Sequence, residues 1–118
     1  MRLSLLPSVL LAGALAVNSF ALAADETPTV LMIRNSKFEP NQLALPSGIK
    51  PKLVIRNLDA IPAEFESYDL SREVVVPGHG ETTIYIGPMD PGSYQFFNDF
   101  NHEMQGSITA KPGVKKEN

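Results

Sequence analysis

Residues 91–106 read PGSYQFFNDFNHEMQG. The Pro-Gly pair is typical of a turn, and the aromatic run from Ser93 to Phe97 predicts a β-strand. A short polar loop carrying Asp99, His102 and Met104 is expected next, followed by a glycine and a last strand over residues 107–110. The chain contains no cysteine, so a metal ion held by this segment would be bound without a thiolate.

Similar short runs of β-branched and aromatic residues fill the rest of the chain, separated by Pro and Gly, and no stretch after the N-terminal region looks helical. Besides the two strands above, we predict strands at residues 29–34, 42–45, 50–57, 63–67, 73–76 and 82–86. Seven or eight short strands at regular spacing are typical of an all-β, antiparallel Greek-key sandwich or barrel. Residues 111–118 are expected to form a flexible polar tail.

The N-terminal residues 1–23 predict a secretory signal peptide. Arg2 precedes an apolar run, and Ala21 and Ala23 are the small residues expected before a cleavage site. An uncleaved membrane anchor is the alternative, because the run approaches the roughly 20 residues that span a bilayer, but Pro7 and the Ala-x-Ala exit favour cleavage. We therefore expect a periplasmic protein with one domain, residues 24–118, not embedded in the membrane after cleavage.

Composition excludes several functions. The formal net charge is −3 at pH 7, which argues against nucleic acid, because a nucleic-acid interface needs a basic face. The absence of cysteine removes disulfides and thiolate chemistry. The two histidines lie in separate segments and no nucleophile–base pair is evident, so a hydrolytic active site is poorly supported.

Several turns and strands together resemble the scaffold of the cupredoxin family. These are the PSG turn at residues 46–48, the PGHG turn at 77–80, and YQF at 94–96 followed by MQG at 104–106. A blue-copper site uses two His, one Cys and a weak axial Met. The resemblance places Ala63 at the first His position, Asn98 at the Cys, Asn101 at the second His and Met104 at the Met. It therefore implies a cupredoxin-like fold with no type 1 copper centre.

Within that family, the EFES segment at residues 64–67 and Asp99 after the aromatic strand resemble one particular branch. These are the cysteine-independent, cupredoxin-like periplasmic proteins and domains that accompany ferrous-iron permease uptake systems. The resemblance implies a metal-binding accessory whose partner is the iron permease or another periplasmic uptake component.

The expected metal ligands are Glu64, Glu66, Asp99, His102 and Met104. Strand periodicity places Glu64 and Glu66 on the same side, and the resemblance brings their strand beside the loop after Asn98. Such mostly hard donors suit iron, Mn(II) or Cu(II), and the thioether adds affinity for Cu(I). We expect copper or iron. The structural alternatives are a solvated edge strand for the glutamates, turn hydrogen bonds for Asp99 and a core position for Met104.

Three functions remain open from the sequence. The first is a metal-binding accessory of ferrous-iron uptake, which would aid delivery or oxidation of Fe(II); ferroxidase-like activity is left open. The second is a copper-binding chaperone or storage protein that uses His102 and Met104. The third is a metal-free module that uses the sandwich to contact a protein partner.

Overall fold

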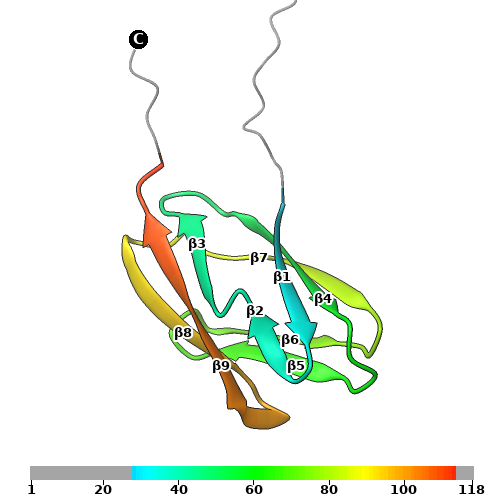
Figure 1. Ribbon diagram of the computed structural model, residues 1–118. Helices are drawn as coiled ribbons and strands as arrows, with labels where there is room; N and C mark the ends of the chain where they lie inside the picture. The colour runs from blue at the N-terminus through cyan, green and yellow to red at the C-terminus, as the bar shows by residue number, and fades with distance from the viewer. Residues whose placement is uncertain (1–27, 114–118) are drawn as a thin grey trace, which may run out of the picture.

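The computed structural model describes residues 28–113, and the predicted signal peptide and the last residues of the predicted tail lie outside this range. Nine strands form the domain (Figure 1). They are β1 (Thr29–Arg34), β2 (Lys37–Glu39), β3 (Gln42–Pro46), β4 (Lys52–Asn57), β5 (Ala63–Ser67), β6 (Arg72–Val76), β7 (Glu81–Tyr85), β8 (Gly92–Asn98) and β9 (Asn101–Lys111). This part of the chain contains no helix long and apolar enough to cross a bilayer.

The strands form two sheets. One sheet has the order β2-β1-β4-β7 and the other the order β3-β9-β8-β5-β6. The predicted all-β sandwich is confirmed, although the sheets are mixed rather than wholly antiparallel, because β1 pairs with β4 and β3 with β9 in parallel. The five-stranded sheet carries the residues of the candidate site.

The core lies between the sheets and is organised around Phe96. Its ring is 5.0 Å from the ring of Phe38, edge to face, and 5.0 Å from that of Phe65. Gly106 is paired with Phe96 across β8 and β9. A Cβ atom at Gly106 would lie 2.3 Å from Cζ of Phe96, so the phenyl ring covers the glycine and leaves no space for a side chain.

Several strand ends differ from the prediction by one or two residues, and β9 includes Lys111, the first residue of the expected tail. Two elements differ more. Strand β2 was not predicted; it follows a tight turn in which Asn35 and Ser36 adopt positive φ angles of 53° and 58°. Their backbone N–H groups both donate to the Asp59 carboxylate at 2.8 Å. This carboxylate ties the β1–β2 turn to the segment after β4.

The predicted loop carrying Asp99, His102 and Met104 was wrong in extent. Strand β9 begins at Asn101, so only Asp99 and Phe100 form the turn between β8 and β9. His102 and Met104 therefore lie on a strand. A register shift next to Phe97 and Asn98 makes this part of the β8–β9 pair irregular, which lets His102 and Met104 face different surroundings despite their even spacing.

Candidate metal site on the five-stranded sheet

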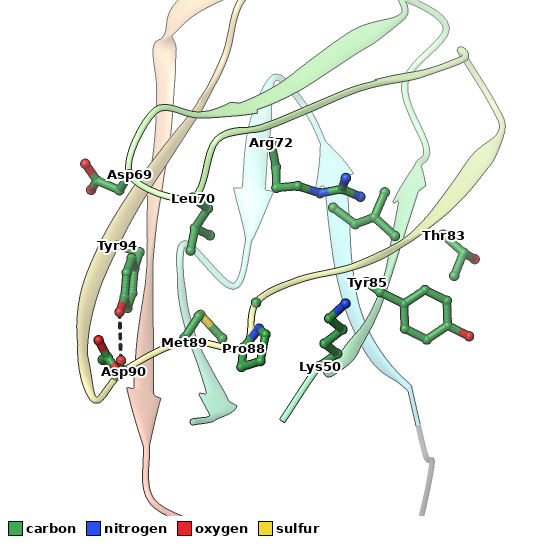
Figure 2. A pocket seen from close by; sticks show the side chains of 12 residues that line it. Lys50, Asp69, Leu70, Arg72, Thr83, Tyr85, Pro88, Met89, Asp90 and Tyr94 are labelled. Carbon is green, nitrogen blue, oxygen red and sulfur yellow. Dashed lines mark hydrogen bonds between the residues drawn. The ribbon is translucent and has the colours of Figure 1, made fainter. Parts of the chain in front are cut away.

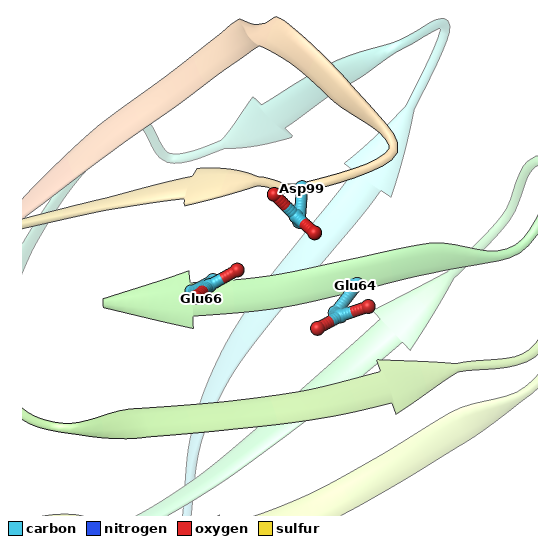
Figure 3. Close-up of side chains that lie close together, drawn as sticks. All are labelled: Glu64, Glu66 and Asp99. Carbon is cyan, nitrogen blue, oxygen red and sulfur yellow. The ribbon is translucent and has the colours of Figure 1, made fainter. Parts of the chain in front are cut away.

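Glu64 and Glu66 project from the same side of β5, as the sequence predicts. They alternate with buried residues of the same strand, in the pattern of a strand with one face on the core. The turn after β8 brings Asp99 beside them, because its backbone N–H donates to the carbonyl oxygen of Glu64 at 2.9 Å. Figure 3 shows the three carboxylates gathered over β5.

The three carboxylates are close enough to share one ion. One carboxylate oxygen from each of Glu64, Glu66 and Asp99 lies within 4.8 Å of the other two. Anionic oxygen donors of this kind suit hard cations and borderline transition metals such as iron. Part of the predicted ligand set is therefore assembled by the backbone geometry of β5 and the β8–β9 turn.

Electrostatic repulsion is concentrated at this cluster. Partial desolvation raises the pKa of Glu64, and the charges of Asp99 and Glu73 and a hydrogen bond with Glu73 raise it further. The pKa of Glu66 is raised by partial desolvation and then by Asp99, Glu73 and Glu64, while His102 lowers it. A bound cation would relieve this repulsion by replacing protons as the compensating charge.

Glu73 is a fourth carboxylate that the sequence analysis missed. It lies on β6 directly across from Glu66 in the antiparallel pair. The short segment between the two strands predicts a hairpin, and counting its register outward from the turn would have paired these residues.

His102 contacts the cluster through Asp99. Its Nε2 lies 3.0 Å from Oδ1 of Asp99, and its ring packs edge to face on Phe97 with centroids 5.2 Å apart. It does not belong to the group of residues whose ligand atoms all lie within 4.8 Å of one another. In this geometry the imidazole contacts the cluster only by way of the Asp99 carboxylate.

Met104 is not brought to the carboxylates. Its side chain is only 5% exposed and belongs to the hydrophobic core. Its sulfur accepts a hydrogen bond from Nδ2 of Asn98 at 3.3 Å. The structure thus places four of the five predicted ligands on the outer face of the sheet and the fifth inside the sandwich.

A separate pocket of about 440 Å³ lies at the end of the sandwich near the β8–β9 turn. Its lining includes Ala63, Asn98, Asn101 and Met104, the four positions that the resemblance assigns to copper ligands. We call this region the pole. The four positions meet there as the resemblance implies, but they offer an alanine methyl, two amides and one thioether.

The pole does not fit a type 1 copper ion. A copper site of that type requires a thiolate and two imidazoles, and none of these groups is present at the four positions. The amide of Asn98 is instead engaged by protein groups: its Oδ1 accepts the backbone N–H groups of Glu64 at 2.9 Å and Phe100 at 3.0 Å. Among residues 28–113, no buried side-chain nitrogen or oxygen lacks a hydrogen-bond partner.

The fold is a β-sandwich of two mixed sheets, and its pole offers no type 1 copper ligand set. In agreement, residues 7–110 match the family model described as a cupredoxin-like domain. The chain belongs to this cupredoxin-like family.

Relatives support the fold. The chain is 40% identical over 79 residues to an uncharacterised protein of Rickettsia prowazekii (strain Madrid E), an alignment that covers 66% of this chain and 63% of that protein. Amicyanin from Paracoccus versutus superposes with a TM-score of 0.59 at 13% identity, covering 72% of this chain and 82% of amicyanin. A copper-containing nitrite reductase from Thermus scotoductus gives 0.57 at 20% identity, covering 74% of this chain and 23% of the reductase.

The carboxylate cluster should lower the stability of the metal-free protein at neutral pH. Glu66 has a raised pKa in the folded protein, so folding favours its protonated form. The folded protein is therefore most stable, with respect to this group, below the unfolded pKa, and it loses that stability as pH rises through the folded pKa. We expect Glu66→Gln to raise the melting temperature at pH 7 without metal, and the gain to vanish as pH falls below 4.5.

Thermal unfolding across that pH range, in the presence of a chelator, measures this effect. Glu103→Gln is the matched control, because Glu103 is an exposed glutamate of β9 outside the cluster. A melting temperature at pH 7 that falls in Glu66→Gln, or rises equally in the control, would contradict the proposed repulsion.

Proposed function

We propose that this chain is a periplasmic accessory protein of a ferrous-iron uptake system that binds an iron or copper ion as cargo. The ligands in this proposal are Glu64, Glu66 and Asp99, and His102 orients Asp99. The observation that carries it is the grouping of three carboxylate oxygens within 4.8 Å on one exposed sheet face. Membership of the cupredoxin-like family supports a metal-related role.

The chemistry of the ligands favours iron as the primary cargo. Anionic oxygens stabilise Fe(III) more than Fe(II), because the attraction grows with the charge of the ion. The site would therefore lower the reduction potential of bound iron and make transfer of one electron from Fe(II) to dioxygen more favourable. The partly exposed position of the cluster suits uptake and release of an ion.

The expected partner is the iron permease or another periplasmic component of the same system. Export is supported by the predicted signal peptide at residues 1–23. The pole, next to the cluster, exposes apolar side chains that suit contact with a protein: Ile61 is 73% exposed and Phe100 is 55% exposed. An ion bound at Asp99 would lie one residue from Phe100 in the chain and so close to such an interface.

A titration tests the metal site. The metal-free protein is titrated with Fe(II) under anaerobic conditions, and with Cu(II) and Cu(I), by calorimetry. We expect Glu66→Gln combined with Asp99→Asn to weaken Fe(II) binding by more than the ~10–100-fold typical of outer-shell changes, and Glu103→Gln to leave it unchanged. Equal affinity in the double variant and the wild type would contradict the site.

Admission of oxygen then separates two roles of the same site. Oxidation of Fe(II) faster than in buffer, lost in the double variant, would support a ferroxidase step. Binding without faster oxidation would support delivery of Fe(II).

A metal-free interaction module is the second candidate, and the apolar pole is the observation that favours it. It predicts no binding of any of the three ions. A copper chaperone, in contrast, predicts preference for Cu(I), but the buried Met104 lies away from the carboxylates and His102.

A further inference from the structure

A second pocket, of about 590 Å³, lies between the edge of the five-stranded sheet at β6 and the edge of the other sheet at β7 (Figure 2). Its lining comes from β6, β7, β8 and the segments before β4, before β6 and before β8. It shares no residue with the carboxylate cluster or the pole. The volume falls within the roughly 300–1,000 Å³ typical of small-molecule sites.

Two cations dominate the open part of this pocket. Figure 2 shows the charged ends of Lys50 and Arg72 directed into the same space. The carboxylates of Asp69 and Asp90 lie on the opposite side and point away from that space. The carboxylate of Asp69 is also engaged elsewhere, because its Oδ2 accepts the backbone N–H of Gln95 at 2.8 Å.

Neither cation has an ion-pair partner within residues 28–113. The ion pairs in that range join Arg34 to Glu39, Arg56 to Glu81 and His102 to Asp99. The lining also carries two carboxylates, but neither forms an ion pair with Lys50 or Arg72. An anion placed between the two cations would relieve their mutual repulsion directly.

A smaller, apolar part of the lining lies beside the charged groups. Met89 is buried in the core cluster, and Leu70 packs against that cluster. Tyr94 is held in place because its hydroxyl donates to the carbonyl oxygen of Asp90 at 2.8 Å. Most of the accessible lining is polar, which suits a small, strongly charged ligand.

From these observations we infer that the pocket binds a small molecule carrying two negative charges, a dicarboxylate or a phosphate, between Lys50 and Arg72. The planar guanidinium of Arg72 presents paired N–H donors that match the oxygens of a carboxylate or phosphate. The ammonium of Lys50, from the segment before β4, adds a point charge. This site has no residue in common with the proposed metal site.

The test uses succinate and inorganic phosphate as probes, with potassium chloride at matched ionic strength as the reference. Binding is followed by amide chemical shifts of the whole exported protein. We expect saturable shifts at residues around the pocket with at least one probe, and a loss of affinity of tenfold or more in Lys50→Gln and in Arg72→Gln.

Saturation by succinate alone identifies a carboxylate ligand, and saturation by phosphate alone identifies a phosphate ligand; either supports the inference.

Lys37→Gln is the matched control, because Lys37 is an exposed cation on β2 outside this pocket. It should bind both probes like the wild type. The Glu66→Gln, Asp99→Asn variant should also keep anion binding, which separates this result from the fate of the metal site. The inference is overturned if neither probe saturates, or if both pocket variants, shown to be folded by their melting temperatures, bind as tightly as the wild type.

Discussion

A blue copper centre is the expected result of combining Ala63→His, Asn98→Cys and Asn101→His. These three positions and Met104 line one pocket, so the substitutions would supply two imidazoles and a thiolate beside the existing thioether, the ligand set of a type 1 site. Removing the Asn98 amide also frees the Met104 sulfur from its hydrogen bond. The measurement is the visible absorption of the protein with Cu(II), where thiolate-to-copper charge transfer gives an intense band.

The matched control carries Ala63→His and Asn101→His but keeps Asn98. Lacking the thiolate, it should bind Cu(II) with no intense visible band. The triple variant should also be less stable than the wild type, because a thiol is a weaker acceptor for the N–H groups of Glu64 and Phe100. A folded triple variant that binds Cu(II) but remains nearly colourless would show that the four side chains do not converge on one point.

Phe96→Ala should cause the largest loss of stability among simple substitutions. The ring is 1% exposed, contacts Phe38 and Phe65 and covers Gly106. Truncation of a buried phenylalanine costs about 3–5 kcal/mol, a large part of the roughly 5–15 kcal/mol that stabilises a small domain. Urea unfolding at equilibrium measures the change.

Phe100→Ala is the control, because it also removes a phenyl ring but at an exposed position. Its ring is 55% exposed, so we expect a change within about 0.5 kcal/mol, as for other surface substitutions. If Phe100→Ala proved as costly as Phe96→Ala, the assignment of Phe96 to the core and Phe100 to the surface would be contradicted.

Most of the fold follows from local patterns in the sequence. Strands β1 and β5 have the predicted bounds, because turn residues flank a continuous apolar run in β1 and a period-two alternation in β5. Strand β2 was missed because three residues carry too little periodicity, although the Asn35-Ser36 pair favours a tight hairpin turn. The mixed pairing of the sheets depends on contacts between distant strands, which no local pattern records.

The candidate site was predictable only in part, because local sequence patterns fix some of its residues while others depend on contacts between strands. The period of two places Glu64 and Glu66 on one face, which the structure confirms. Separating His102 from Met104 was not possible from spacing, because the irregularity in β9 changes the direction of one side chain relative to the other. The nearness of Glu73 depends on the register of a neighbouring strand. The identity of the ion and the partner remains a prediction.

The three hydrogen bonds of the Asn98 amide have a consequence for how this protein could act as a carrier. They join β5, the β8–β9 turn and β9 at the pole through a side chain of the protein itself, which cannot dissociate as a metal ion can. In a protein whose folded state is stabilised by a bound metal ion, release of the ion lowers the free energy of unfolding. Here the Asn98 amide holds the pole together by hydrogen bonds, and the candidate ion site lies on the sheet surface. Binding and release of an ion therefore need not be coupled to folding. If the proposed site binds an ion, the domain can release it and remain folded.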